Sequence, residues 1–379
     1  FLEAIGTEEE PIIFTSLADD DNPIEAERTD PGSGDPSAGN WIGLSVPEVV
    51  CSGSAEYCGQ LEHVEIRYAG LQGQPSLSIE QQRTLLRNSV IRDGAGPAIG
   101  IEDADDVQIL DNEIENMLGD GIAIEADSSI ETTIQGNRIV NTERAVSAEA
   151  DAQVVLGTDE ATRNEVEDNQ TNGIVVSGTV RRQRNWTPDD LIWVLEDRIS
   201  IDGGSLQIAP GAVVKSELEA SISLSRGSIL IGEPDAERPV LLTGLRDDVC
   251  GVDDEVGDCD TNGDGEASTP LPGDWIGITL SKGNSGDKTI INNAVVRYAG
   301  ANEAAVASDM AWTDIDRLVV ERSLTDGLLL TDVGTVSRAA TVKGLVARDN
   351  RLGTGLRILG DSYATILSAV FTANPRSIE

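Results

Sequence analysis

The sequence contains few histidine, lysine, cysteine and aromatic residues. Its 379 residues include one histidine (His63), two methionines and only 3% aromatic residues. A single histidine excludes any site built from several histidines, such as a His-rich zinc centre. No run of 18 apolar residues occurs, so we expect no membrane insertion in this segment.

The charge is strongly one-sided. There are 67 Asp and Glu against 27 Lys and Arg, which gives a formal net charge of -40, and only four of the basic residues are lysines. Such a chain repels nucleic acid, so nucleic acid is excluded as a general partner. Many carboxylates with few lysines are typical of a halophilic protein, in which salt screens the self-repulsion. An ordinary acidic secreted protein has a similar composition, and both interpretations stay open.

The four cysteines form two close pairs in the sequence. Cys51 and Cys58 bracket one short loop, and Cys250 and Cys259 bracket another. Two local disulfides, each worth about 2–3 kcal/mol, suit an oxidising compartment and hence a secreted or cell-surface location. Thiolate metal ligation is the alternative, but neither pair has CxxC spacing and no histidine partner is evident.

A short pattern recurs along the first half of the chain. Asn88, Asn112, Asn137 and Asn164 each open a short alternating segment, at steps of 24, 25 and 27 residues. A second short segment follows in each step, as in AIGIEDA, GIAIEAD, AVSAEAD and GIVVSGT. The alternation of apolar and polar residues predicts short strands and excludes a helical solenoid, which needs a period of 3.6.

These repeats predict the fold class: all-β, a right-handed parallel β-helix. A step of about 24 residues suits one rung whose strands pair with those of the next rung, roughly 4.8 Å away. Recurring asparagines at one corner are expected to stack into an amide ladder. A β-sandwich would explain the strands but not the asparagines recurring in step.

A longer repeat indicates two tandem copies of one unit. PIIFTSLADD at residue 11 matches PVLLTGLRDD at 239, and NWIGLSV around Trp41 matches DWIGITL around Trp275. We predict copy one over residues 1–179, lacking its opening rungs, and copy two over residues 180–379, lacking its last rungs, in a continuous solenoid. The chain is accordingly expected to be a fragment, a processed form or a segment of a longer array.

The order of motifs in the second half resembles a known family. SLQIAPGAVVK, ERPVLLTGLRDD, CDTNGDGEASTPLPGDWIGI and VVRYAG follow one another. They resemble bacterial secreted or cell-surface right-handed parallel β-helix repeats of the PGTVVKF, FTSLKDD, DTNGDG and PGDWGGI type. The resemblance is close over about residues 190–300 and weaker over 1–70, where DTNGDG is missing. It implies the fold and an exported location more than an activity.

The DTNGDG segment predicts a calcium site. Oxygen ligands at alternate positions followed by Gly265 resemble the first half of a calcium loop, and hard oxygens without histidine or thiolate favour Ca²⁺. Leu271 stands where a full EF-hand needs an acidic ligand, so Asp258 or Asp274 would complete the set. The alternative is a solvated acidic loop without metal. The predicted ligands are Asp258, Asp260, Asn262, Asp264 and Glu266.

The sequence identifies no catalytic residues. A polysaccharide lyase on this fold would need a basic side chain to remove a proton beside a uronate carboxylate. Candidates are Arg67, Arg92, Arg138 and Lys343. A hydrolase would need two carboxylates across a cleft, and acids are too common here for a pair to be distinctive.

Two residue pairs at equivalent places in the two copies allow two interpretations. Arg67 and Arg297 in the RYAG motifs could contact carbohydrate or could pair with a carboxylate of the fold. Trp41 and Trp275 could stack on a sugar ring or could hold a long loop against the solenoid. We favour the structural interpretation for both pairs.

We therefore expect a non-catalytic extracellular module, acting as a stalk, adhesin or filament subunit and stabilised by calcium and local disulfides. Repetition favours a spacer, since an enzyme needs one cleft. The alternatives are a calcium-dependent polysaccharide lyase or hydrolase, and a carbohydrate-binding module. Expected partners are the chain itself, head to tail, or neighbouring units of a longer chain, and a surface glycan.

Overall fold

The computed structural model describes most of the chain. The described residues are 2–20, 35–48, 56–81, 83–104, 106–125, 131–250, 259–265, 267–281, 287–310 and 312–379. They form short strands and one 3-10 turn, Leu71–Gly73. The chain divides into two compact units, Phe1–Ile174 and Val175–Glu379, and the division falls inside strand β18 (Thr171–Val180).

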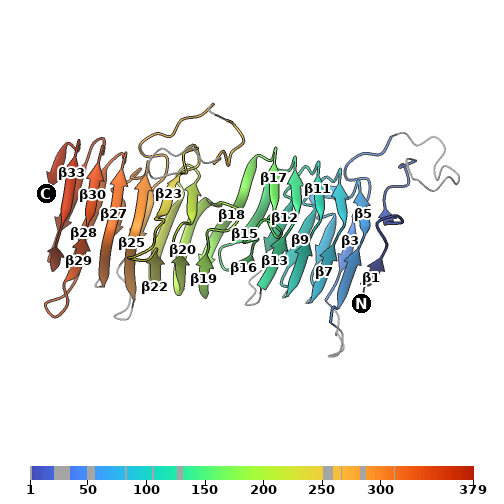
Figure 1. The fold of residues 1–379 in the computed structure, drawn as a ribbon, viewed down its shortest axis with the longest axis horizontal. Coiled ribbons are helices and arrows are strands. Elements are labelled where there is room, and N and C mark those ends of the chain that lie inside the picture. Colours follow the sequence, from blue (N-terminus) through green and yellow to red (C-terminus); the bar gives the residue numbers. More distant parts are fainter. Residues whose placement is uncertain are drawn as a thin grey trace. The chain divides into compact units, whose positions relative to one another are not determined.

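The first unit is built from three sheets of parallel strands (Figure 1). Within each sheet, the strands of successive rungs lie side by side. The first sheet contains β1 (Leu2–Ile5), β4 (Gly59–Glu62), β7 (Thr84–Arg87), β10 (Val107–Leu110), β13 (Glu131–Gln135) and β16 (Gln153–Val155). The second contains β2 (Ile12–Phe14), β5 (Val64–Arg67), β8 (Val90–Arg92), β11 (Glu113–Glu115), β14 (Arg138–Val140) and β17 (Glu165–Glu167). The third contains β3 (Leu44–Val46), β6 (Leu77–Ile79), β9 (Ile99–Glu102), β12 (Ile122–Glu125) and β15 (Arg144–Glu149).

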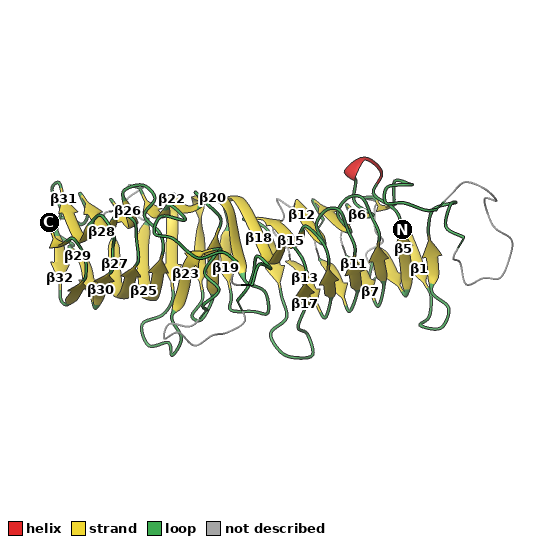
Figure 2. Cartoon of the chain, turned by 90° about the horizontal axis from the view of Figure 1, so that it is seen from above, coloured by secondary structure: helices red, strands yellow, loops and turns green. Residues whose placement is uncertain are grey.

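The second unit stacks in the same parallel way with longer strands (Figure 2). Its opening strands are β19 (Gln183–Trp186), β20 (Trp193–Ile208), β21 (Val213–Ser216), β22 (Ser221–Ile231), β23 (Val240–Gly244) and β24 (Gly277–Leu280). They are followed by β25 (Lys288–Arg297), β26 (Ala304–Ser308), β27 (Thr313–Glu321), β28 (Asp326–Thr331) and β29 (Ala340–Lys343). The last are β30 (Leu345–Arg348), β31 (Thr354–Leu359), β32 (Ala364–Ile366), β33 (Ala369–Thr372) and β34 (Arg376–Ile378). Each strand pairs with the strand one rung away, as β25 does with β27 and β27 with β30.

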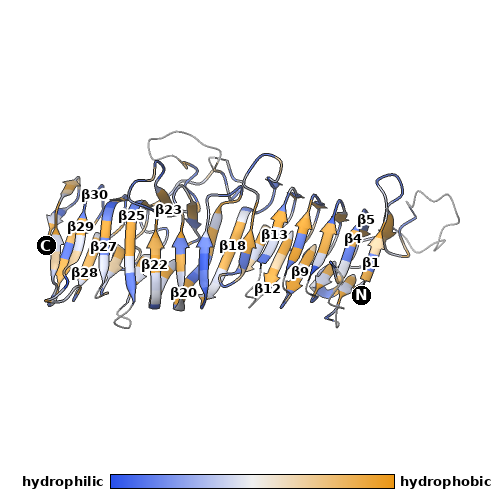
Figure 3. Cartoon of the chain, turned by 60° about the horizontal axis from the view of Figure 1, so that its bottom comes forward, coloured by the Kyte–Doolittle hydropathy of each residue, from blue (hydrophilic) through white to orange (hydrophobic). Residues whose placement is uncertain are grey.

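The core of each unit is a set of apolar columns. In the first unit, Ile66, Ile91, Ile114 and Ile139 occupy successive registered positions on β5, β8, β11 and β14, and none is exposed. Along many strands apolar and polar residues alternate, as the colour bands in Figure 3 show, so every second side chain of these strands enters the core. Burying each aliphatic side chain contributes about 1.5–3 kcal/mol. The all-β parallel stack predicted from the sequence is therefore confirmed.

The corners between strands depend on left-handed residues. His63, Asn88, Asp111 and Gly136 all have φ between 47° and 69°, and each separates a strand of the first sheet from the second. Asparagine, aspartate and glycine tolerate this conformation best. At Gly136 a Cβ would lie 2.3 Å from Asp111 Oδ1 of the rung before, so a larger residue would require the Asp111 side chain to move.

The predicted amide ladder exists at three of its four positions. Asn137 Oδ1 accepts from the backbone N–H of Asn112 (3.0 Å) and from its side-chain amide (2.9 Å). Asn164 Oδ1 accepts from Asn137 in the same two ways, at 3.1 and 3.0 Å. All three asparagines are at most 2% exposed. Each rung is thereby linked to the next through a buried side chain.

The prediction for Asn88 is wrong. Asn88 is the exposed left-handed corner residue, and the neighbouring Ser89 is buried in the ladder position. Ser89 N–H donates to Asn112 Oδ1 (3.0 Å), and Ser89 Oγ accepts from Val64 N–H (3.2 Å). The sequence spacing could not separate the two because the corner and the ladder position are adjacent, and both accept small polar residues.

We expect Asn137→Ala to lower the free energy of unfolding by about 2–4 kcal/mol, because buried donors of Asn112 lose their acceptor. Chemical denaturation followed by circular dichroism measures this change. The matched control is Asn88→Gly, which keeps the left-handed corner and should change stability by less than about 0.5 kcal/mol. Equal losses in the two variants would contradict the importance of the ladder.

Candidate functional site

The candidate site lies on the long excursion between β23 and β24. Strand β23 is buried along its whole length, and the chain leaves the stack at Leu245 and rejoins it near Trp275. A disulfide joins Cys250 to Cys259 and closes part of this excursion, as predicted from the sequence. Cys58 is also disulfide-bonded, and its predicted partner Cys51 lies outside the described residues.

The DTNGDG segment folds into a tight loop around Asp260. The Asp260 carboxylate accepts the backbone N–H groups of Asp264 (3.0 Å) and Gly265 (2.7 Å). Gly263 and Gly265 are left-handed, with φ of 64° and 65°. The Asn262 amide donates to Asp264 Oδ2 at 2.8 Å, so the loop holds its own polar side chains in place.

Three carboxylates gather at this loop. Oxygens of Asp248, Asp260 and Asp264 lie within 4.8 Å of one another. Asp260, Asn262 and Asp264 were predicted from the sequence, whereas Asp248 was not. Asp248 is the last residue of TGLRDD, 12 residues before Asp260, and this spacing does not match a calcium-loop pattern. The fold brings Asp248 to the loop because the chain segment after β23 lies beside it. The predicted ligands Asp258 and Glu266 lie outside the described residues.

Two oxygens at the loop lack a protein partner. Oδ1 of Asn262 and of Asp264 are buried and have no hydrogen-bond partner, whereas Oδ1 of Asp248 lies 3.6 Å from Lys215 Nζ. Buried acceptors without partners are costly, and a bound ion or water would satisfy them. Asp274, the alternative ligand, instead accepts from Leu271 N–H and pairs with Arg246 at 3.5 Å, so it is engaged outside the cluster.

A buried lysine lies next to the carboxylates. Lys215, on β21, is fully buried, with its Nζ 3.6 Å from Asp248 Oδ1, and it donates to the Cys259 carbonyl. Burial lowers the pKa of Lys215, and burial raises the pKa of Asp248 while Lys215 opposes that rise. Asp260 and Asp264 also raise the Asp248 pKa through repulsion. Lys215 therefore pairs with one of the three clustered carboxylates, Asp248, and the cluster keeps an excess of negative charge.

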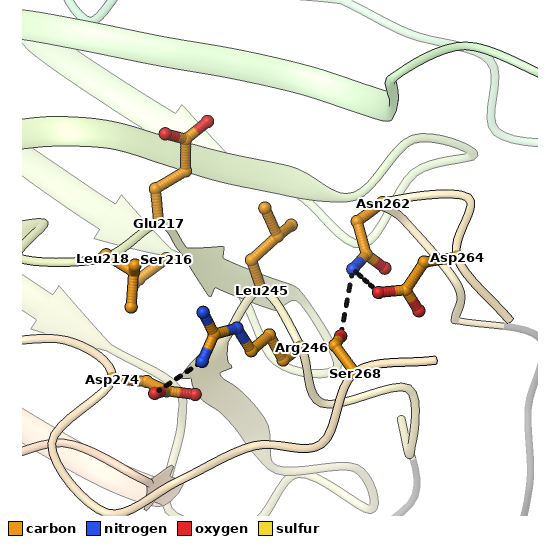
Figure 4. A pocket seen from close by; sticks show the side chains of 9 residues that line it. All are labelled: Ser216, Glu217, Leu218, Leu245, Arg246, Asn262, Asp264, Ser268 and Asp274. Atoms are coloured by element: carbon orange, nitrogen blue, oxygen red, sulfur yellow. Dashed lines mark hydrogen bonds and ion pairs between the residues drawn. The ribbon is translucent and has the colours of Figure 1, made fainter. Parts of the chain in front are cut away.

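A pocket of about 380 Å³ adjoins the loop (Figure 4). Its wall combines the end of β21, the residues after β23 and the DTNGDG loop. Asp264 belongs both to this wall and to the carboxylate cluster, and Asn262, also in the wall, donates to Asp264. The lining residues are Ser216, Glu217, Leu218, Leu245, Arg246, Asn262, Asp264, Ser268 and Asp274.

In the first unit, Arg67 is buried and forms ion pairs within the fold. It is 8% exposed and bonds Glu65 at 2.6 Å and Asp19 at 3.3 Å. Burial alone would raise the pKa of Glu65, but hydrogen bonds from Arg67 and Arg92 hold it below its usual value. Trp41 Nε1 donates to the Arg67 carbonyl at 2.7 Å, which ties the preceding loop to the stack.

The second unit repeats this arrangement. Arg297 is 3% exposed and pairs with Glu321 at 2.7 Å and with Asp247 at 3.6 Å. Trp275 Nε1 donates to the Arg297 carbonyl at 2.8 Å, and Trp275 is fully buried. Stacking of a sugar on the Trp275 ring is therefore wrong, because the folded protein leaves no face of that ring accessible.

The remaining candidate bases are also engaged. Arg92 bonds Glu65 at 2.9 Å, Arg138 pairs with Glu113 at 3.2 Å, and Lys343 pairs with Asp316 at 2.9 Å. None of the three lines the pocket beside the loop. They take part in ion pairs between neighbouring rungs.

Comparison with known proteins supports the fold. Residues 50–185 match a family model described as a right-handed β-helix region. No curated protein and no solved structure matches the chain. The matched residues do not include the cation cluster or the pocket. Within the part of the chain that the structure describes, no helix is long and apolar enough to cross a bilayer. The parallel stack and the family match together identify the fold as a right-handed parallel β-helix.

Replacing Lys215 tests the electrostatic balance of the site. Lys215→Met keeps an unbranched side chain, one heavy atom shorter, but removes the charge beside Asp248. We expect the melting temperature without divalent cations to fall, with a loss of about 3 kcal/mol. The control Lys343→Met removes an exposed lysine from an ion pair and should change the melting temperature far less. An unchanged or raised stability in Lys215→Met would show that Lys215 does not offset the repulsion.

Proposed function

We propose that this protein is a non-catalytic extracellular module, a stalk, adhesin or filament subunit, stiffened by stacked rungs and stabilised by calcium and disulfides. The observation that carries the proposal is that buried polar side chains connect successive rungs, or connect loops to the stack. The amide ladder and the ion pairs of Arg67 and Arg297 all link rungs or loops to the stack. Groups of this kind serve the rigidity of a stack, and a rigid stack suits a spacer.

Calcium is the proposed resident cation. The residues that would hold it are Asp248, Asp260, Asn262 and Asp264, which offer carboxylate and amide oxygens. Ca²⁺ takes six to eight oxygen ligands, and hard oxygens favour it over zinc or copper. Bound there, calcium would supply the positive charge that Lys215 alone does not. It would also link the end of β23 to a loop that lies twelve or more residues further along the chain.

The proposed location is extracellular, and the proposed partners are other copies or units of the chain and a surface glycan. The disulfide between Cys250 and Cys259 suits an oxidising compartment. A net charge of -40 favours solubility and suits a salty medium, in which the repulsion is screened. Head-to-tail association, pairing with neighbouring units and binding of a surface glycan are all compatible with such a module.

Removal of calcium tests the cation site. Saturating calcium should raise the melting temperature by about 3 °C over the value in chelator, because a ligand at about 100 times its Kd adds about 2.7 kcal/mol. Asp264→Ala should abolish that difference. The control Asp235→Ala changes an exposed loop carboxylate outside the cluster and should keep it. If calcium raised the melting temperature of Asp264→Ala by the same amount, the DTNGDG loop would not be the calcium site.

The non-catalytic role is tested with polysaccharides. We expect no product from neutral or uronate-containing polysaccharides incubated with the purified protein and calcium. Absorbance of unsaturated uronate detects lyase activity, and reducing-end assays detect hydrolysis. Turnover that is lost in Arg92→Gln or Lys343→Gln would instead support the alternative, a calcium-dependent polysaccharide lyase.

A further inference from the structure

Two limbs of the excursion between β23 and β24 meet at the carboxylate cluster. The outgoing limb, residues 245–250, carries Asp248, and the returning limb, residues 259–265, carries Asp260 and Asp264. Oxygens of the three carboxylates lie within 4.8 Å of one another. Because like charges repel, the limbs would move apart unless other interactions held them together. The cluster therefore depends on the links between the two limbs.

The Cys250–Cys259 disulfide joins the limbs directly beside the carboxylates. Cys250 follows Asp248 by two residues, and Cys259 immediately precedes Asp260. The bond holds the two cysteine Cα atoms 5.7 Å apart. A disulfide does not span Cα atoms more than about 7 Å apart, so the intact bond limits how far Asp248 can move from Asp260.

Lys215 is a second link between the limbs. Its Nζ donates to the carbonyl of Cys259 on the returning limb and, at 3.5 Å, to the carbonyl of Leu245 on the outgoing limb. Hydrogen bonds of this kind open and form again, whereas the disulfide is covalent. The disulfide is therefore the link that fixes the spacing of the limbs when no cation is bound.

Each limb is also anchored by itself. On the outgoing limb, Leu245 N–H donates to the Ser216 carbonyl at 2.8 Å, and the Val249 carbonyl accepts from Arg297 Nη1 at 3.3 Å. On the returning limb, the Asp260 carboxylate holds the backbone of the DTNGDG loop. Breaking the disulfide should therefore leave both limbs folded and change mainly the spacing between them.

We propose that the Cys250–Cys259 disulfide controls the affinity of the calcium site, so that reduction of this bond releases calcium. Reduction adds two electrons and two protons and gives two thiols, and a dithiol reductant supplies them and becomes a disulfide itself. Repulsion between the carboxylates then separates the limbs. The inference rests on the proposed calcium site, because it needs an ion held by Asp248, Asp260 and Asp264 together.

The coupling must act in both directions. If the disulfide raises the affinity for calcium, bound calcium makes the disulfide harder to reduce by the same factor, because linkage between two equilibria is reciprocal. Couplings of this kind change affinities roughly 5- to 150-fold, and we expect about tenfold here.

Calcium binding with and without the disulfide tests the first direction. Isothermal titration compares the wild-type chain with the double variant Cys250→Ser/Cys259→Ser. We expect the calcium Kd to rise about tenfold in the variant, with the β-sheet signal in circular dichroism unchanged. The matched control is Cys51→Ser/Cys58→Ser, which removes the other cysteine pair and should leave the calcium Kd unchanged.

Reduction of the wild-type chain tests the other direction. The protein is equilibrated with dithiothreitol in calcium or in chelator, free thiols are alkylated, and peptide mass spectrometry measures the label on each cysteine. Calcium should lower the equilibrium constant for reduction of the Cys250–Cys259 bond about tenfold and leave that of the bond formed by Cys58 unchanged. In Asp264→Ala, calcium should no longer protect the Cys250–Cys259 bond.

The outcomes distinguish this inference from the calcium proposal. If the oxidised chain binds no calcium, the calcium site is rejected and the inference with it. Equal calcium affinity in the wild type and in Cys250→Ser/Cys259→Ser overturns the inference and leaves the calcium site standing. Equal protection of both disulfides by calcium would show a general stabilisation in place of a local link, and would overturn the inference as well. If the double variant does not fold, the labelling of the wild-type chain decides.

Discussion

The structure depends on backbone hydrogen bonding between successive rungs. Each strand is too short to be stable alone, and its N–H and C=O groups are satisfied only when the next rung lies in register above it. The asparagine ladder continues this pairing at the corner, where Asn112, Asn137 and Asn164 accept and donate between rungs in a fully buried position. Because the side chain of one rung caps the backbone of another, a slip of one residue would expose the apolar columns and break the ladder together.

The same stacking creates the main electrostatic problem of the chain. In-register strands bring equivalent residues close to one another, so like charges meet where an acid recurs, as Glu102 and Glu125 do on the exposed side of β9 and β12. Elsewhere the stack alternates sign: Glu62 registers with Arg87, and Glu321 lies between Arg297 and Arg348. In each of these pairs the basic residue is an arginine on a strand. An acidic chain of this kind should tolerate salt well, because screening weakens the remaining repulsion.

The candidate site lies on the segment between β23 and β24, which leaves the stack of rungs and is attached to it at both ends. The Cys250–Cys259 disulfide, the Trp275 hydrogen bond to the Arg297 carbonyl and the buried Lys215 fix both ends of the excursion. Within it, the DTNGDG loop has little regular structure and depends on its own hydrogen bonds. A loop built mainly from carboxylates and glycines gains most from a bound cation, since the ion replaces repulsion with shared coordination.

The sequence by itself determined the fold class, the parallel stacking, the local disulfide of the second half and three of the residues that gather at the loop. It could do so because rung spacing and the DTNGDG pattern are local signals, repeated or contiguous in the chain. The tertiary structure alone decided that Ser89 replaces Asn88 in the ladder, that Trp275 is buried, and that Asp248 joins Asp260 and Asp264 beside a fully buried Lys215. The physical reason is that burial and charge proximity depend on which segments the solenoid brings together, and no spacing along the chain encodes the approach of β21, β23 and a loop that lies beyond them.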